Sequence, residues 1–154
     1  MRIPNTVSRV ADHTPAPVNE RIRRQIEENV AMFGNAGPEI LERRLQELDR
    51  EWDIERVLET NAASVMLLGA LLGTTKNRGW FLLSVISAGF LLQHAVQGWC
   101  PPVVWFRRLG FRTASEIDYE RYALKALRGD FRSVPDHSGN GRLAVGAILD
   151  AVKR

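Results

Sequence analysis

Apolar residues in the first third of the chain recur every three or four positions, in two stretches. They are Val18, Ile22, Ile26, Val30 and Phe33 in the first stretch, and Leu41, Leu45, Leu48, Trp52 and Leu58 in the second. This spacing predicts amphipathic helices over residues 17–34 and 38–59, the second with Pro38 at its first position. Because their polar faces mix acids with bases, an antiparallel hairpin or a self-associating arm is favoured over adsorption to a lipid surface.

The middle of the chain is almost continuously apolar. Residues 79–100 would form a helix roughly 33 Å long, which matches the hydrocarbon core of a bilayer. The prolines at positions 101 and 102 are expected to stop this helix. Residues 60–75 form a shorter apolar stretch, which needs part of the preceding turn or a thinner bilayer to cross. We therefore expect a transmembrane helical hairpin with a tight turn at residues 76–78. The alternative is a buried hairpin in a soluble bundle.

The charges of this 154-residue chain, net +3, support the same division. Residues 1–59 hold nine basic and twelve acidic side chains, and residues 107–154 hold ten and six. Between them only Lys76 and Arg78 carry a fixed charge, which is unusual for a soluble domain. Since basic residues gather beside the outer ends of both crossings, the positive-inside rule predicts that both termini are cytoplasmic.

The two ends of the chain are expected to differ from each other. Residues 1–16 are predicted to be flexible and, having no apolar h-region, not a signal peptide. Ser115 and Asp118 have capping-box spacing and predict a helix over residues 113–132. Residues 133–141 have the composition of a linker, and residues 142–154 predict a short amphipathic helix. A single cysteine excludes an intrachain disulfide framework.

Small and amphipathic residues suggest how the hairpin packs. Gly69 and Gly73 form a GxxxG motif, which lets helix backbones approach closely in lipid. The motif serves either homodimerisation or packing within the chain against Ser84, Ser87 and Ala88. The expected anchors at the membrane–water boundary are Trp80, Trp99, Arg107 and Arg108.

Four polar residues near the end of the second crossing are candidates for chemistry. Gln93, His94 and Gln97 suggest a hydrogen-bond cluster between helices, or alternatively a ligand or haem contact by His94. Cys100 is either a small residue packed at a helix end or a reactive thiol near two arginines.

Motifs of the common enzyme classes are missing. The sequence contains no P-loop, GxSxG, HExxH or GxGxxG motif, and no face that combines aromatic with basic residues. We therefore expect a protein without enzymatic activity, metal or cofactor, and without a nucleic-acid partner.

The sequence Gly-Trp-Cys-Pro at 98–101, followed by Leu-Gly-Phe at 109–111, resembles the YgaP-like transmembrane domain, a family of unknown function. The resemblance covers residues 54–111 and implies a homodimeric hairpin in the bacterial inner membrane, with cytoplasmic termini. The namesake of the family also has a rhodanese domain, whose cysteine opens an anion-binding loop. Because this chain lacks such a loop, sulfurtransferase activity cannot be assigned to Cys100.

These observations predict an all-α protein in which a transmembrane hairpin, residues 60–112, is flanked by amphipathic cytoplasmic helices. The leading hypothesis is a non-enzymatic inner-membrane protein that dimerises through the hairpin. Its residues 17–59 and its helices after the hairpin would then present a surface to a cytoplasmic protein. The alternative is a membrane-edge thiol or haem protein that assists sulfur handling or electron transfer. A soluble helical bundle is the third hypothesis.

Overall fold

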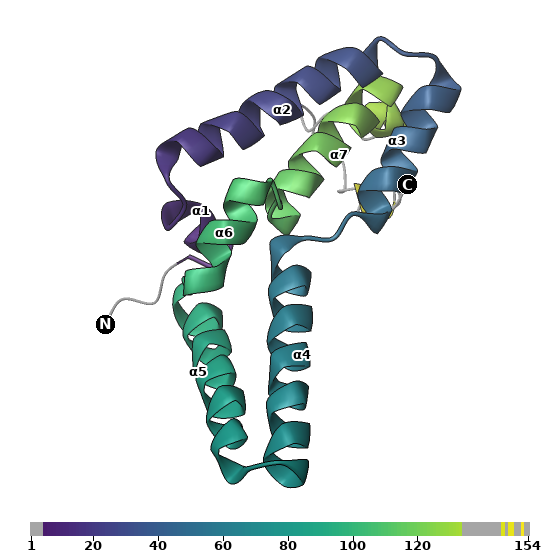
Figure 1. Ribbon diagram of the computed structural model, residues 1–154. Helices are drawn as coiled ribbons and strands as arrows, with labels where there is room; N and C mark the ends of the chain where they lie inside the picture. The colour runs from purple at the N-terminus through teal and green to yellow at the C-terminus, as the bar shows by residue number, and fades with distance from the viewer. Residues whose placement is uncertain (1–4, 134–145, 147, 150–151, 153–154) are drawn as a thin grey trace. The chain divides into compact units, whose positions relative to one another are not determined.

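The computed structural model describes residues 5–133, 146, 148–149 and 152, and all regular secondary structure in these residues is helical (Figure 1). The elements are α1 (Arg9–Asp12), α2 (Ala16–Gly34), α3 (Pro38–Arg50), α4 (Ile54–Thr75), η1 (Arg78–Trp80), α5 (Phe81–Gln97), α6 (Pro101–Leu109), α7 (Ala114–Arg128) and η2 (Asp130–Ser133). The all-α prediction is confirmed for this part of the chain. Apart from Ser133 and a few single positions, the expected linker and C-terminal helix lie outside the described residues. Two compact units divide the chain, residues 1–24 with 51–117, and residues 25–50 with 118–154.

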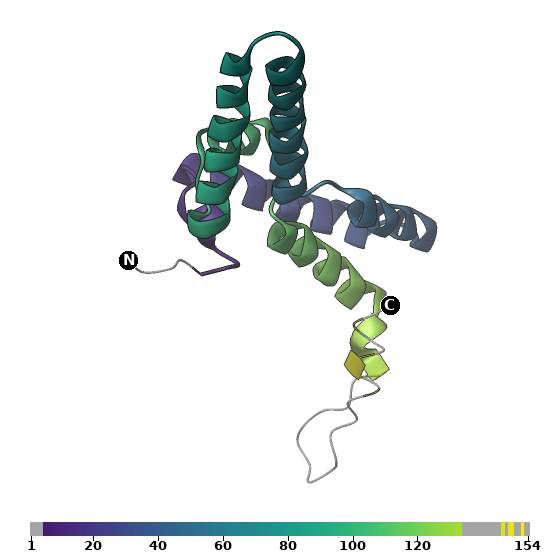
Figure 2. The same ribbon diagram turned by 90° about the horizontal axis from the view of Figure 1, so that it is seen from below.

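In the first unit, α4 and α5 form an antiparallel hairpin joined by η1 (Figure 2). The helix predicted over residues 38–59 is instead two helices. The side chain of Asp53 caps α4 by accepting a hydrogen bond from Arg56 N at 2.7 Å, and Ile54 N donates to Arg112 O at 2.8 Å. Because α4 begins at Ile54, it has 22 residues, or about 33 Å, of which the apolar residues 60–75 form the greater part.

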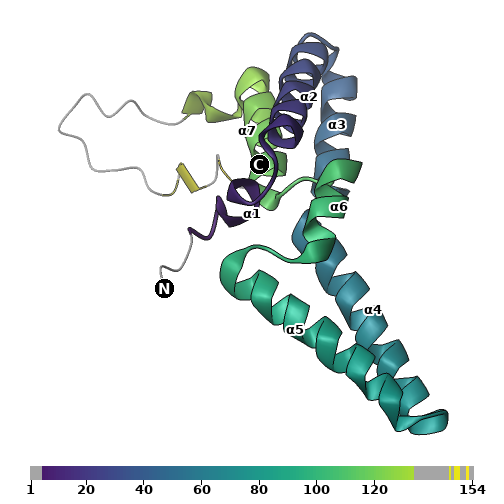
Figure 3. The same ribbon diagram turned by 60° about the vertical axis from the view of Figure 1, so that its left-hand side comes forward.

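The end of α5 also differs from the prediction. Gly98 terminates α5 in the left-handed conformation, with φ of 74°, and a Cβ atom there would lie 2.6 Å from Arg9 Cβ. Glycine therefore meets both a conformational and a steric demand at this position. The prolines at 101 and 102 do not end a helix but begin α6, since proline lacks an N–H that the first turn does not need. Figure 3 shows α6 returning to the start of α4.

A small apolar core joins these helices. It consists of Val10, Ile54, Leu58, Cys100 and Val103, each at most 4% exposed. Val10 belongs to α1, so the N-terminal segment that was expected to be flexible contains a helix with a buried side chain. The apolar contact fixes α1 against the end of the hairpin, which is the region that holds the candidate site described below.

Arg107 of α6 is fully buried and has hydrogen-bond acceptors from several elements of the first unit. Its guanidinium donates to both carboxylate oxygens of Glu116, at 2.6 and 2.7 Å, and to Phe111 O at 3.0 Å. It also donates to Thr14 Oγ1 at 3.1 Å and to Asn19 Oδ1 at 2.9 Å. A buried charge is tolerated only when its hydrogen bonds are satisfied, and these five acceptors meet that demand. The expectation that Arg107 faces lipid headgroups is therefore wrong.

The partner of Arg107 also closes the capping box of α7. Thr113 N donates to Glu116 Oε2 at 2.8 Å, and Glu116 N donates to Thr113 Oγ1 at 3.2 Å. The capping box thus begins two residues before the predicted Ser115–Asp118 pair. Burial opposes ionisation of Glu116, but the hydrogen bonds from Arg107 and Thr113 outweigh it and lower the pKa of this carboxyl.

The second unit contains the end of α2, α3 and most of α7. Its apolar interior includes Leu45, Leu48 and Leu124, each at most 4% exposed. Glu120 is fully buried among them and accepts hydrogen bonds from Asn29 Nδ2 at 3.2 Å and Arg44 Nε at 2.9 Å. The unit thus buries an acidic side chain together with its own donors, as the first unit does with Arg107.

Replacing Arg107 tests its structural role. We expect Arg107→Met to lose about 3–5 kcal/mol of stability, because Glu116 is left without its main partner in a buried place. The matched control is Arg108→Met, whose exposed side chain should contribute within about 0.5 kcal/mol. Thermal unfolding in detergent, followed by circular dichroism, measures both; equal melting temperatures for the two variants would contradict the assignment.

Candidate functional site at the end of the apolar hairpin

The two helices of the hairpin pack through small residues. Gly69 lies against Ser84, where a Cβ atom would come within 2.6 Å of Ser84 Oγ and 3.0 Å of its backbone nitrogen. A Cβ atom at Gly73 would meet the ring of Phe81 at 2.9 Å. The GxxxG motif is thus occupied within the chain, whereas Ala88 is exposed. This is the packing within the chain that the sequence allowed for the motif.

Hydroxyl groups in the hairpin bond to helix carbonyls. Ser84 Oγ donates to Met66 O at 2.8 Å and Ser87 Oγ to Ala62 O at 3.2 Å, both across the hairpin. Ser64, Thr74 and Thr75 donate to carbonyls of their own helix, at 2.7 to 2.9 Å. Such internal pairing is what a polar group needs where water is excluded.

Large apolar side chains remain exposed along both helices. On α4 they include Leu67, Leu68 and Leu71, which are 52–63% exposed; on α5 they include Leu82, Val85 and Leu92, which are 62–66% exposed. Both helices are long and apolar enough to cross a membrane, although only 22% of the most apolar part of Pro38–Thr75 and 6% of that of Arg78–Gln97 are buried. A core helix of a soluble protein is mostly buried, which these helices are not.

The expected boundary residues occupy different environments. Trp80 is 45% exposed in η1, Trp99 is half-buried, and Arg108 is exposed on α6. The sequence reasoning missed α6 and with it Trp105 and Leu109, which are 69% and 73% exposed and lie one turn apart. Their exposure opposite the buried Val103 and Arg107 makes α6 amphipathic.

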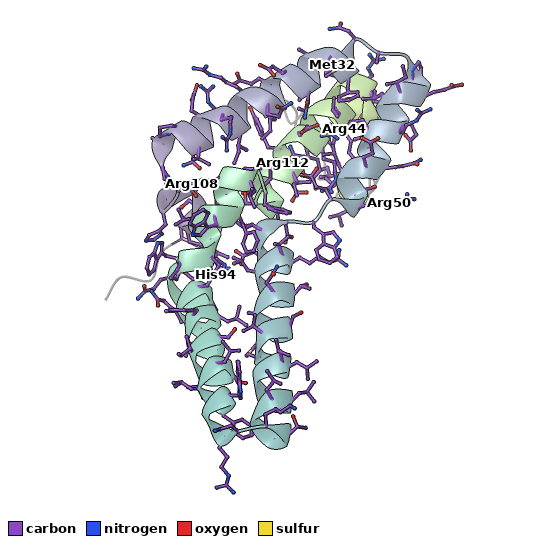
Figure 4. All side chains as sticks on the ribbon, in the orientation of Figure 1. Met32, Arg44, Arg50, His94, Arg108 and Arg112 are labelled. Atoms are coloured by element: carbon purple, nitrogen blue, oxygen red, sulfur yellow. The ribbon has the colours of Figure 1, made fainter. Side chains whose placement is uncertain are left out.

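At the end of α5, where Figure 4 labels His94, the structure brings a carboxylate, an imidazole and a thiol together. His94 Nε2 donates to Glu55 Oε2 at 2.6 Å, and the Cys100 thiol lies beside the same ring. His94 is 2% exposed and Cys100 3% exposed. Gln93 and Gln97 are half-exposed, so the partner of His94 is not the expected glutamine cluster but an acid of α4.

Arg9 of α1 orients this carboxylate from its other side. Its guanidinium donates to Glu55 Oε1 at 3.1 Å and to Ala95 O at 2.6 Å. The hydrogen bond from His94 is the largest cause that lowers the pKa of Glu55, and it outweighs the opposing effect of burial. Glu55 is thus held as an anion between two donors. The second ring nitrogen, His94 Nδ1, is buried and has no hydrogen bond of ordinary geometry among the described residues.

An apolar cavity of about 330 Å³ begins at these groups and continues along the hairpin. His94 and Cys100 line it together with residues of both helices, among them Leu58, Val65, Leu83 and Phe90. Ser87 and Asn61 also line it, but their side chains bond to the backbone oxygens of Ala62 and Val57. The cavity therefore offers a long apolar wall with chemically reactive groups at one end.

The described residues contain no group of three or more histidine, cysteine, aspartate or glutamate side chains arranged to hold a metal ion. Glu55 was the member of the site that sequence reasoning missed. It is separated from His94 by 39 positions, and nothing in the local pattern distinguishes it from the other acids of residues 38–59.

Comparison with known proteins gives no relative. No protein-family model, no curated protein and no solved structure matches this chain. Its function is therefore argued below from its own residues.

Substituting Gly69 and Gly89 by alanine separates the effect of packing on stability from the effect of helix propensity. Alanine at either position gains about 1 kcal/mol of propensity. We expect Gly69→Ala to lower the melting temperature in detergent, because overpacking against Ser84 costs about 1–3 kcal/mol. Gly89→Ala, compared with Gly69→Ala on the detergent-solubilised monomer, is the matched control, since a Cβ atom there meets nothing of its own chain within 4 Å, and it should be neutral or stabilising. An equal response of the two variants would show that the close approach at Gly69 does not stabilise the hairpin.

Proposed function

We propose that the chain is a non-enzymatic membrane protein whose hairpin, residues 60–75 and 79–97, crosses a lipid bilayer. The observation that carries this proposal is the exposure of large apolar side chains along α4 and α5. In water each such side chain costs about 1.5–3 kcal/mol relative to burial, whereas lipid removes that cost. The internally paired hydroxyls of both helices support the same environment.

The proposed location is the bacterial inner membrane, with both termini in the cytoplasm. The basic residues at the outer ends of the hairpin support this orientation, because only Lys76 and Arg78 lie at the turn. The resemblance of residues 98–101 and 109–111 to the YgaP-like transmembrane domain supports the choice of membrane.

We further propose that the hairpin forms a homodimer and that the charged helices outside it present a surface to a cytoplasmic protein. Since Gly69 packs against Ser84 of the same chain, the outer face of α5 is the better candidate for the dimer contact. Gly89 lies on that face with open space around it, and Val85 and Leu92 flank it. A small residue between exposed apolar ones allows helix backbones to approach closely in lipid.

A second candidate function is a membrane-edge thiol protein. The arrangement of Glu55, His94 and Cys100 favours it, because an imidazole held by a carboxylate is a base that activates an adjacent thiol. The haem form of this hypothesis gains less support, since Glu55 already occupies Nε2 of His94.

Membrane insertion is tested by fractionation of bacterial cells that express the full chain. We expect the protein to stay in the membrane through alkaline carbonate extraction and to need detergent for release. The variant Leu67→Asp with Leu71→Asp should lose this retention, because each aspartate costs about 2.5–3.5 kcal/mol within the bilayer. The matched control places the same charges at exposed apolar residues outside the hairpin, Met32→Asp with Ile40→Asp, and should be retained. Recovery of the natural chain as a detergent-free monomer would favour the soluble bundle instead.

Dimerisation is tested by cysteine cross-linking in membranes, in a Cys100→Ser background. We expect Gly89→Cys to give a covalent dimer with a bifunctional maleimide, because this position lies on the proposed contact. Ser84→Cys, which faces Gly69 inside the hairpin, should remain monomeric. Monomers for Gly89→Cys, or dimers for both variants, would contradict an interface on the outer face of α5.

A further inference from the structure

The Cys100 thiol and the His94 imidazole line one end of an apolar cavity on the hairpin, and Glu55 accepts a hydrogen bond from this imidazole. We propose that Cys100 is a site of S-acylation, which accepts a long-chain acyl group from an acyl thioester and holds the chain in the cavity. The inference rests on the proposed membrane insertion, since it places the cavity beside lipid. It goes beyond that proposal by assigning a modification site and the chemical class of its donor.

The three groups have the order that thiol activation requires. Glu55 accepts the hydrogen bond from His94 Nε2, which leaves Nδ1 as the ring nitrogen that can exchange a proton with Cys100. Nδ1 is buried, has no other hydrogen bond among the described residues and belongs to a side chain that lines the cavity. Cys100 lies beside this ring, so its proton has an acceptor.

The shape of the cavity selects the acyl group. From Leu83 to His94 its wall follows α5 for eleven residues, or roughly 16 Å, which is the length of a long alkyl chain rather than an acetyl group. The polar side chains in the wall, Asn61 and Ser87, are turned to backbone oxygens. Cys100 is 3% exposed, so the donor approaches through the cavity rather than directly from bulk water.

The reaction is an exchange of one thioester for another, without oxidation or reduction. The Cys100 proton passes to His94 Nδ1 as the sulfur attacks the thioester carbonyl carbon and forms a new carbon–sulfur bond. The tetrahedral intermediate then breaks its bond to the sulfur of the donor. The departing thiolate then takes this proton from His94, while Glu55 holds the ring in its orientation.

The test uses the full chain in detergent micelles, with palmitoyl-coenzyme A and acetyl-coenzyme A as the two donors. Intact-mass spectrometry should find one palmitoyl adduct that hydroxylamine removes, and no adduct on Cys100→Ser. We expect His94→Ala to slow the reaction about a hundredfold, which is the usual contribution of a general base. His13→Ala is the matched control, because His13 is exposed at the C-terminal end of α1. This variant should react at the rate of the natural chain.

The proposal is overturned if Cys100 of the natural chain forms no palmitoyl adduct, or if the acetyl donor reacts as fast as the palmitoyl donor. The comparison of donors uses the unmodified chain and does not depend on the folding of any variant. Equal rates for His94→Ala and His13→Ala would likewise overturn it. Because Cys100→Ser should still pass the carbonate extraction test, a failure of acylation is distinguishable from a failure of membrane insertion.

Discussion

The fully buried guanidinium of Arg107 is the constraint on which the rest of the first unit depends. A charge without access to water must be paired, and its acceptors come from the turn before α2, from α2 itself, from the end of α6 and from the first turn of α7. Satisfying one side chain therefore fixes two stretches of the chain, residues 14–19 and 111–116, that are far apart in sequence. Cys100 immediately precedes α6, and Val103 lies one turn before Arg107. The pair of Arg107 with Glu116 therefore also fixes where the Cys100 thiol lies against α4.

The hairpin also satisfies the hydrogen bonds of its polar side chains, but it does so without ion pairs between residues 60–75 and 79–97. Its hydroxyls use helix carbonyls as acceptors, so no charged partner has to be brought between α4 and α5. His94 is the exception, an ionisable side chain at the end of α5 that is buried and needs a carboxylate from α4. An apolar residue at position 94 would pack there without this demand. The packing of α5 therefore does not require the pair of His94 with Glu55, and this makes the pair a candidate functional site.

The features that sequence could predict are those that depend on local pattern. The apolar period of residues 18–33 and the near-absence of charge in residues 60–106 are properties of neighbouring positions, and they led to the helices of the hairpin. The break at residues 51–53 could not be found in this way, because an apolar period continues through it. That break depends on the cap formed by Asp53 and on the bond from Ile54 N to Arg112 O, a residue far along the chain.

The candidate site was only partly predictable for a related reason. His94 and Cys100 stood out as rare polar residues at the end of an apolar stretch, but their nearness depends on Gly98, which turns the chain so that α6 can begin at Pro101. The prolines were read as a stop because proline is unfavourable inside a helix, although its first turn accepts proline readily. Glu55 looked like any acid of an amphipathic helix, since only the tertiary fold places it beside His94.

The position of the thiol follows from where the first unit keeps its charges. The ion pairs of Arg9 with Glu55, Arg107 with Glu116 and Arg112 with Glu51 are all formed by residues outside the apolar stretches 60–75 and 79–97. On the other side of Cys100 the cavity wall is apolar as far as Val65 and Leu83. A molecule with a charged head and an apolar chain can therefore reach Cys100 with each part in its preferred surroundings, whereas a purely polar or purely apolar donor would lose one of them. An acyl thioester therefore fits the site because charged residues lie on one side of Cys100 and an apolar wall on the other, and not because of the cysteine alone.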